Sequence, residues 1–302
     1  WVTAADADRK QEGGVKGYYR LMLSSCVFAV ALFGFSTKFN GFAYFLASVW
    51  LISPAIMFYA SKSRKNTAQL IKKEDRKFLS DIAKRTWQYF EDFTSATDNY
   101  LTPDNFQEDP PNGLAHRTSP TNIGLELAAI VTAKDFGFIS SEKAVEMLER
   151  LVGTMQRLEK WNGHFYNWYN TKTLEVLRPR YISTVDSGNL LGYIIIAVAS
   201  LHAIEKENPE ICERAKAVAA TLREIYESTT FKPLYDKQRD LFSIGYNVEE
   251  EHLTKSYYDL LSSEARMASF IAISKGDVPK KHWFTLGDRK STRLNSSHRI
   301  RS

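Results

Sequence analysis

Cysteine is almost absent from this chain of 302 residues, which contains only Cys26 and Cys212. One lies in an apolar run and the other in a helical pattern far along the chain, so the sequence predicts neither a disulfide framework nor a zinc knuckle. Both are expected to be small packing residues. A glycine-rich phosphate loop, an HExxH pair and a CxxC pair are also missing. The sequence therefore predicts no metal site and no cofactor.

A real excess of positive charge is lacking as well, although the chain has 40 Lys and Arg residues against 35 Asp and Glu. Without the last fourteen residues, basic and acidic side chains are equal in number. Nucleic-acid binding needs a concentrated basic patch, so this class of function is disfavoured. The five cations of that segment are Arg289, Lys290, Arg293, Arg299 and Arg301.

The same final segment, RKSTRLNSSHRIRS, follows a helix-and-loop pattern that stops without a cap. It resembles translated adapter sequence, so we expect residues 289–302 to be an artefact and exclude them from fold reasoning. On this interpretation the chain is a fragment that is cut near Gly287. The alternative is a natural basic tail.

Two uncharged apolar runs, residues 21–37 and 42–60, are separated by the short turn KFNG. Each is about long enough for a tilted helix to cross the hydrocarbon of a membrane, so we expect an antiparallel transmembrane hairpin with the lipid bilayer as its partner. The alternative is a buried or interfacial hairpin in a soluble protein. Because Lys and Arg flank both outer ends, both ends are predicted to be cytoplasmic. Candidate interfacial anchors are Tyr44, Trp50 and Tyr59.

Helical periodicity dominates the rest of the chain, and strand patterns are almost absent. The stretch 187–205 is apolar all round, as in a buried inner helix, whereas its neighbours are amphipathic. Such alternation predicts a toroid of helical hairpins whose connecting loops form one mouth. The expected helices cover residues 75–94, 119–136, 142–160, 187–205, 209–228 and 257–275. A closed double ring of helices would need roughly twice as many.

Four stretches are rich in groups that bind sugars, because flat rings stack on pyranoses and polar side chains bond the hydroxyl groups. Each also has a structural alternative: the aromatic loop could plug the barrel end, Asp186 could be a helix cap, and Glu249 and Glu250 could simply face solvent. The stretches are WNGHFYNWY (161–169), STVDSGNL (183–190), LFSIGYNVEE (241–250) and the long segment 256–284.

Glu264 lies between Ser263 and Arg266 in a pattern with apolar neighbours, so we expect its carboxyl group to be held near the core. Burial favours the protonated form and suits a proton donor, an effect that Arg266 would oppose. A structural Glu–Arg pair is the alternative. Glycoside cleavage generally uses two carboxyl groups, and Asp186 is also available. Their separation is not fixed by the sequence, so the residues alone leave the reaction class open.

Five motifs in order resemble the middle region of cyclic β-1,2-glucan synthases, and the match extends from the membrane hairpin to about Leu286. The resemblance implies an all-α fold, in which the membrane helical hairpin is followed by an incomplete (α/α)6 toroid of the glycoamylase-like type. It implies a retaining transglycosylase that cleaves and rejoins β-1,2-glucosidic bonds, and it extends to endo-β-1,2-glucanases of related fold. The motifs are RTSPTNIGL, GHFYNWY, TVDSGNL, LFSIGYN and YYDLLSSEARMASFIAISKGDVPKKHWF.

The resemblance also implies roles for individual residues. Glu264 matches an essential glutamate and is expected to be the general acid, with Asp186 as the other candidate catalytic group. The family's second glutamate belongs to a later motif that this chain does not reach, so we expect the chain alone to be inactive. The donor cleft is expected to be lined by Arg117, Asn122, His164, Tyr166, Trp168, Tyr246, Asp259 and Arg266.

The implied organisation is a cytoplasmic N-terminal remnant (1–20), two transmembrane helices (21–61), the N-terminal half of the glycoamylase-like domain (62–288) and the artefactual tail (289–302). The implied partners are linear β-1,2-glucan and the remaining domains of a parent synthase. The location is a bacterial inner membrane, multi-pass, with the soluble domain on the cytoplasmic side. Two other functions stay open: a membrane-tethered carbohydrate-binding module without catalysis, and a hydrolase like the endo-β-1,2-glucanases.

Overall fold

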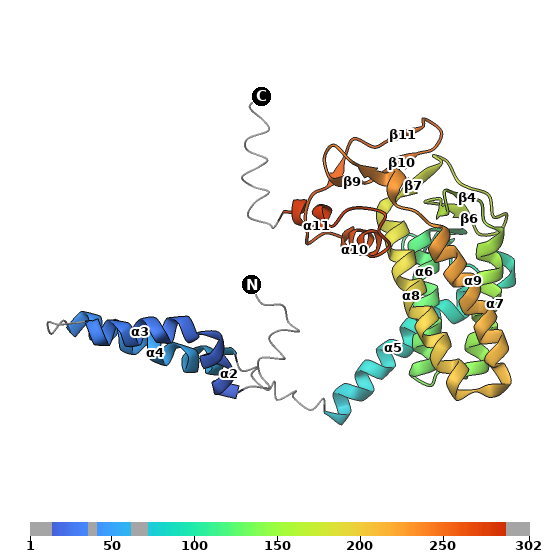
Figure 1. The fold of residues 1–302 in the computed structure, drawn as a ribbon. Helices are drawn as coiled ribbons and strands as arrows, with labels where there is room; N and C mark the ends of the chain where they lie inside the picture. The colour runs from blue at the N-terminus through green and yellow to red at the C-terminus, as the bar shows by residue number, and fades with distance from the viewer. Residues whose placement is uncertain (1–13, 36–40, 62–71, 288–302) are drawn as a thin grey trace. The chain divides into compact units, whose positions relative to one another are not determined.

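A computed structural model describes residues 14–35, 41–61 and 72–287 (Figure 1). The chain forms two compact units, Trp1–Arg76 and Lys77–Ser302. Three expected features lie outside the described residues: most of the N-terminal segment 1–20, the KFNG turn and the tail 289–302. The first unit contains the helices α2 (Gly14–Leu21), α3 (Leu23–Phe35) and α4 (Gly41–Ser61), and α5 (Lys73–Phe93) begins at its end.

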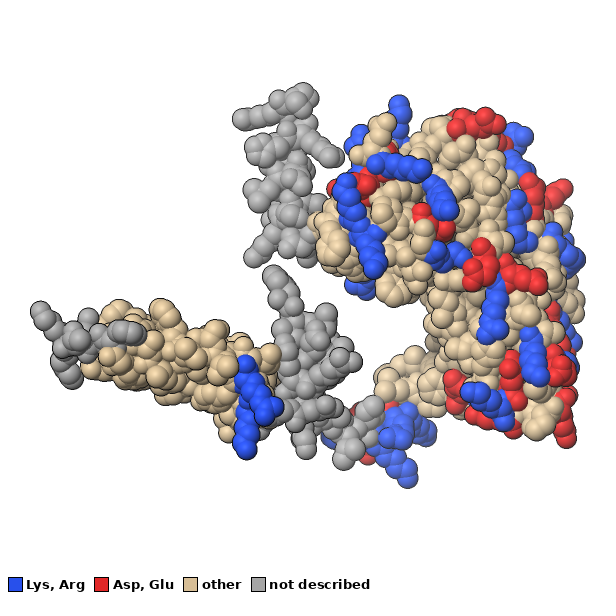
Figure 2. Space-filling model, viewed as in Figure 1, with Lys and Arg blue, Asp and Glu red and all other residues tan. Residues whose placement is uncertain are grey.

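Helices α3 and α4 form an antiparallel pair without a charged residue, and Figure 2 shows their uncharged surface. The rings of Phe28 and Trp50 lie 5.3 Å apart, and those of Phe33 and Tyr44 lie 5.4 Å apart. Many large apolar side chains of this pair face outward, as lipid favours. Helix α4 is long and apolar enough to cross a membrane. Helix α3, which covers most of the first apolar run, has 13 residues and reaches the length of a span only together with α2, which it meets at 71°.

The second unit is built mainly from helices, as the sequence predicts. Ser119 starts α6 by accepting a hydrogen bond from the backbone N–H of Asn122, and Pro120 occupies the first helical position. Gly137 follows the end of this helix with a φ of +73°, a conformation that favours glycine. After α5 the helices are α6 (Pro120–Asp135), α7 (Ser141–Arg157), α8 (Thr184–Glu207), α9 (Cys212–Ser228), α10 (Arg266–Ser274) and α11 (Lys281–Thr285), with 3-10 turns η1 (Ala96–Asp98), η2 (Pro209–Ile211) and η3 (Lys232–Leu234).

Helix α8 forms the centre of an inner layer, where it packs against α6, α9 and α10, while α7 packs against α6 and α9 (Figure 1). It too meets the length and apolarity of a membrane span, but half of that stretch is buried among its neighbours. Gly188 allows α8 and α10 to approach closely, because a Cβ there would lie 2.5 Å from the Cβ of Ala268. The expected all-α architecture, a membrane helical hairpin and part of a helical toroid, is confirmed.

The described residues also form twelve strands of two or three residues. The sequence did not predict them, because runs this short show no period of two. They pair antiparallel and gather at one end of the helices, where they brace the connections that lead into α6, α8 and α10 (Figure 1). The strands are β1 (Phe106–Gln107), β2 (Gly113–Leu114), β3 (Arg117–Thr118), β4 (Lys160–Trp161), β5 (His164–Phe165), β6 (Tyr169–Asn170), β7 (Tyr181–Ser183), β8 (Tyr235–Asp236), β9 (Leu241–Ser243), β10 (Gly245–Asn247), β11 (His252–Leu253) and β12 (Tyr257–Tyr258).

The helix expected over 257–275 is wrong in its first half. Tyr257 and Tyr258 pair with β9 opposite Ser243 and Phe242, so their backbone groups are used in a ladder. Helix α10 begins only at Arg266. Glu264 therefore lies in the loop before α10 and not inside a helix.

Candidate active site

The starts of helices α6, α8 and α10 lie together and form one polar region. Each start directly follows a strand or the loop after a strand. At α6 and α8 the contact is a hydrogen bond from Asn189 Nδ2 to Thr121 Oγ1 of 3.2 Å. At α8 and α10 it is the close approach of Gly188 to Ala268. The sequence-predicted residues Arg117, Asn122, Asp186 and Glu264 occur at these helix starts. The fold thus brings to one end of the toroid groups that are distant in the sequence.

Tyr258 lies beside Glu264, one of the two candidate carboxyl groups. Its hydroxyl donates a hydrogen bond of 3.3 Å to Glu264 Oε1. Burial raises the pKa of Tyr258, and the negative charge of Glu264, with smaller effects of Tyr181 and Asp186, raises it further. The phenol therefore keeps its proton at neutral pH. Asp186 lies in the first turn of α8 and Glu264 in the loop before α10, and these two helices approach each other closely at Gly188 and Ala268.

Glu264 itself is exposed, which corrects the expectation of a carboxyl group near the core. The reason is the loop that replaces the first half of the expected helix. Among the ion pairs of residues 72–287, none joins Glu264 to Arg266, so the alternative of a structural Glu–Arg pair is also wrong. Arg266 and Asp259 are exposed, and the backbone carbonyl of Asp259 accepts a hydrogen bond from Gly287 N.

Asp186 is not the cap of α8. Ser183 performs that role, because its Oγ accepts a hydrogen bond of 3.2 Å from the backbone N–H of Asp186. The half-buried carboxylate of Asp186 is thus left in the first turn, where the positive end of the helix dipole favours a negative charge. It remains available for a ligand at the mouth.

Asp104 organises the start of α6, and sequence reasoning missed it. Arg117 donates to Asp104 Oδ2 from Nε at 3.2 Å and from Nη2 at 2.9 Å, while Asn122 Nδ2 donates to Oδ1 at 3.2 Å. The guanidinium carbon of Arg117 also lies 4.6 Å from the ring centroid of Trp168. Asp104 lies in a proline-rich acidic loop without periodicity, so only the contacts reveal its role.

His164 and Tyr166 lie in the core beneath this region. His164 is 1% exposed, and burial lowers its pKa to about 4, so the ring is neutral. Its Nε2 donates to the carbonyl of Thr230 at 2.7 Å, and Nδ1 lies 2.8 Å from Ser187 Oγ on α8. Tyr166 is 2% exposed and accepts a hydrogen bond of 2.9 Å from Arg180. Both side chains brace the mouth from within.

Tyr246, the remaining predicted contact, is half-buried in β10. Its ring stacks on Trp161 with centroids 4.5 Å apart and planes at 20°. Part of the aromatic motif is therefore occupied in pairing with another ring. Within residues 14–35, 41–61 and 72–287, no group of three or more His, Cys, Asp or Glu could hold a metal ion.

Residues 81–224 match a family described as protein of unknown function (DUF3131). The cyclic β-(1,2)-glucan synthase NdvB of Rhizobium meliloti (strain 1021) is 29% identical to the chain, over 95% of the chain and 14% of the synthase. The resemblance to cyclic β-1,2-glucan synthases that the motifs indicate is thus confirmed. The chain spans only 14% of the length of this relative.

Two solved structures share the fold of the helical unit. An endo-β-1,2-glucanase from Chitinophaga pinensis, in complex with sophorotriose and glucose, superposes with a TM-score of 0.57 at 16% identity, over 71% of this chain and 51% of that chain. A β-1,2-glucanase from Parabacteroides distasonis gives 0.59 at 13% identity, over 70% and 30% of the two chains. At these identities the likeness establishes the fold, a helical toroid.

Proposed function

We propose that the chain carries a β-1,2-glucan-processing region of a larger membrane protein, which cleaves and rejoins β-1,2-glucosidic bonds with retention of configuration. Linear β-1,2-glucan is then its substrate, and the other domains of a synthase are its partners. The similarity to the rhizobial synthase supports this proposal, as does the fold shared with a glucanase in complex with sophorotriose.

The observation that carries the proposal is the occurrence of Asp186 and Glu264 at the starts of α8 and α10, two helices that meet at Gly188 and Ala268, with Tyr258 bonded to Glu264. In the proposed reaction Glu264 donates a proton to the leaving glycosidic oxygen, and Asp186 is the second carboxyl group that this part of the chain offers. In a retaining transfer the second carboxylate bonds the anomeric carbon, and a sugar hydroxyl of the acceptor then displaces it as its proton returns to the first carboxylate.

Further residues are proposed to hold the glucan. Arg117 and Trp168 present a stacked guanidinium and ring, a surface suited to one face of a pyranose. Tyr246 offers a second aromatic ring, whereas His164 and Tyr166 support the cleft from the core and do not touch substrate. The other proposed contacts at the helix starts and their loops are Asn122, Asp259 and Arg266.

We also propose a bacterial inner-membrane location, with a multi-pass anchor and the helical unit on the cytoplasmic side. Basic residues support this orientation, because Lys16 and Arg20 precede α3 whereas Lys72 and Lys73 follow α4. Positive charge next to membrane spans is enriched on the cytoplasmic side. The proposed organisation is an N-terminal segment (1–20), two transmembrane helices (21–61), the N-terminal half of a glycoamylase-like domain (62–288) and an artefactual tail (289–302).

A carbohydrate-binding module without catalysis is the second candidate, because stacked aromatic and polar side chains bind sugars without any use of the carboxyl groups. The first test is therefore binding of linear β-1,2-glucan to the chain in nanodiscs, with β-1,3- and β-1,4-glucans as controls for linkage. We expect binding of the β-1,2-linked polymer alone. Equal binding of all three glucans would contradict the proposal.

Chemistry is tested by joining residues up to Leu286 to the corresponding continuation of the rhizobial synthase. Glu264→Gln in this chimera is expected to abolish transfer while glucan binding persists, and Glu250→Gln, at an exposed acid, is the matched control. Rings or redistributed chain lengths indicate transfer, whereas linear products with new reducing ends indicate a hydrolase. Full activity of Glu264→Gln would reject Glu264 as the general acid.

A further inference from the structure

A pocket of about 390 Å³ opens beside Arg117, outside the group of residues around Glu264. We call it the amide pocket, because three of its lining residues carry carboxamides: Asn105, Gln107 and Asn112. His116, Arg117 and Leu177 complete most of the lining. No carboxylate lines it. Its volume falls in the usual range for sites that bind small ligands.

The carboxamides of Gln107 and Asn112 are free in the part of the chain that the structure describes. Neither side chain makes a hydrogen bond to another residue within the described part of the chain. Asn105 donates from Nδ2 to Asp104 Oδ2 at 2.9 Å. A carboxamide both donates and accepts, which matches a sugar hydroxyl that does the same. The pocket is therefore suited to a neutral ligand with many hydroxyl groups.

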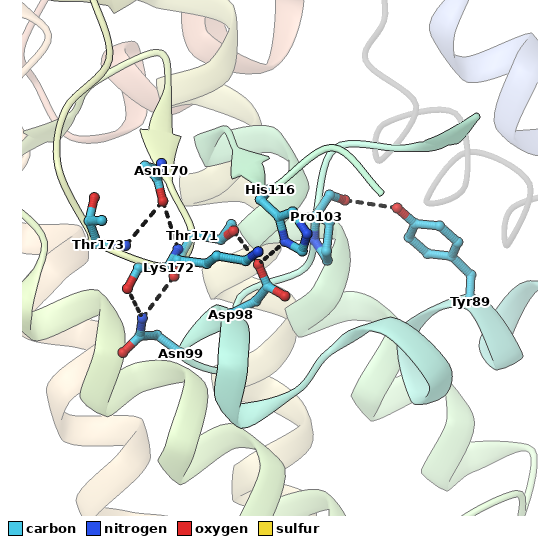
Figure 3. Close-up of polar contacts among 9 residues, drawn as sticks. All are labelled: Tyr89, Asp98, Asn99, Pro103, His116, Asn170, Thr171, Lys172 and Thr173. Carbon is cyan, nitrogen blue, oxygen red and sulfur yellow. Dashed lines mark hydrogen bonds and ion pairs between the residues drawn. The ribbon is translucent and has the colours of Figure 1, made fainter. Parts of the chain in front are cut away.

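His116, one of the residues that line the amide pocket, belongs to a network of hydrogen bonds with its neighbours (Figure 3). Asp98 is 2% exposed, and its Oδ1 lies 2.7 Å from His116 Nδ1 and also accepts a hydrogen bond from Thr171 Oγ1. Asn99 Nδ2 donates to the carbonyls of Thr171 and Lys172 at 2.8 and 2.9 Å. These bonds fix the ring that lines the pocket before any ligand arrives, which lowers the entropic cost of binding.

Arg117 connects the pocket to the proposed glucan site, because it lines the pocket and also lies over the ring of Trp168. The strands β1 and β2 pair Phe106 with Leu114 and so hold the loop that carries the amides. We propose that the amide pocket is an outer subsite, which binds glucose units of a β-1,2-glucan chain beyond those next to the reacting bond. This inference rests on the proposed function, and it adds the place at which a long glucan chain is bound.

The test compares two ligands, a β-1,2-linked trisaccharide of glucose and a linear β-1,2-glucan of about ten units, by titration calorimetry on the full chain in nanodiscs. The double variant Gln107→Ala/Asn112→Ala removes the two free amides. Two neutral hydrogen bonds correspond to about a tenfold change in the dissociation constant. We expect about tenfold weaker binding of the long glucan and unchanged binding of the trisaccharide.

Gln156→Ala is the matched control, because Gln156 is exposed on α7 and does not line the pocket. A second variant, Gln107→Glu/Asn112→Asp, keeps the size of both side chains and should weaken the long glucan similarly by removing donors. Unchanged affinity for the long glucan in both double variants overturns the outer subsite. Equal weakening of both ligands also overturns it, because the pocket would then bind the inner units. If the unaltered chain binds neither ligand, the proposed function itself fails.

Discussion

Glu126 offers a sharp test of the packing around the start of α6. It is 1% exposed, and its Oε2 accepts hydrogen bonds from the backbone N–H and the hydroxyl of Thr102 at 2.8 and 2.7 Å. Burial raises its pKa from 4.5 to about 7, against the opposing effect of the hydrogen bonds from Thr102 and Thr94. Ionising this carboxyl group is therefore more costly in the folded chain than in the unfolded chain.

The sign and size of the effect follow from linkage. A carboxyl group with a raised pKa stabilises the fold most below pH 4.5, and this contribution is lost as the pH rises to about 7. A shift of this size corresponds to about 3 kcal/mol. Glu126→Gln cannot ionise and keeps an oxygen that accepts from Thr102. We expect its stability relative to the unaltered chain to rise by about 3 kcal/mol between pH 4.5 and 7.

Urea unfolding followed by circular dichroism at several pH values, in one detergent, measures this difference. Glu142→Gln is the control, because Glu142 is an exposed acid in the first turn of α7. It measures how the removal of a surface carboxylate changes the pH dependence of stability. A stability difference for Glu126→Gln that stays constant or falls as the pH rises would refute the reasoning.

Two further predictions concern packing and pH. Burial lowers the pKa of His164 from 6.5 to about 4, so the stabilisation by its neutral ring is complete above pH 6.5 and is lost as the pH falls. The unaltered chain should therefore lose about 2 kcal/mol of unfolding free energy at this residue between pH 7 and 5, and His164→Gln should not. Urea midpoints measure this difference, and an unaltered pH dependence in the variant would contradict the prediction. Gly188→Ala should lower the free energy of unfolding by about 1 to 3 kcal/mol or more, because the new methyl group meets Ala268. In the control Gly153→Ala, in α7, the methyl group meets nothing within 4 Å and should stabilise the chain by up to about 1 kcal/mol. Equal thermal midpoints for both variants would count against the close approach of α8 and α10.

Much of the fold could be predicted because its helices carry strong local signals. The Ser-Pro start of α6 and the glycine after its end appear in the structure as the sequence predicts. The stretch from Tyr257 to Glu264 could not be predicted, because a ladder with β9 replaces the helix that its apolar spacing suggests. Tertiary pairing of two tyrosines overrides a local period in this segment.

The site was predictable in type but less so in detail. Aromatic density indicated a sugar site, yet His164 and Tyr166 from that motif are core residues, whereas the mouth displays Trp168. Exposure depends on which face a two-residue strand turns outward, and such strands have no pattern in the sequence. The contribution of Asp104 depends on two partners far along the chain, Arg117 and Asn122, so no local signal could reveal it.

Two buried acids hold the segment that leads to Asp104. Asp98 bonds His116 and Thr171, and Glu126 bonds Thr102, two residues before Asp104. A buried carboxyl group is costly, and at Glu126 the cost lies in ionisation near neutral pH. A charged acceptor binds Thr102 more strongly than an amide does. Glu126→Gln therefore weakens the hydrogen bond that positions the Asp104 loop, while it removes the cost of ionising a buried carboxyl group. We therefore expect this variant to gain stability relative to the unaltered chain as the pH rises from 4.5 to 7, and to bind β-1,2-glucan more weakly. Such an opposition arises when a functional site is positioned at the expense of stability.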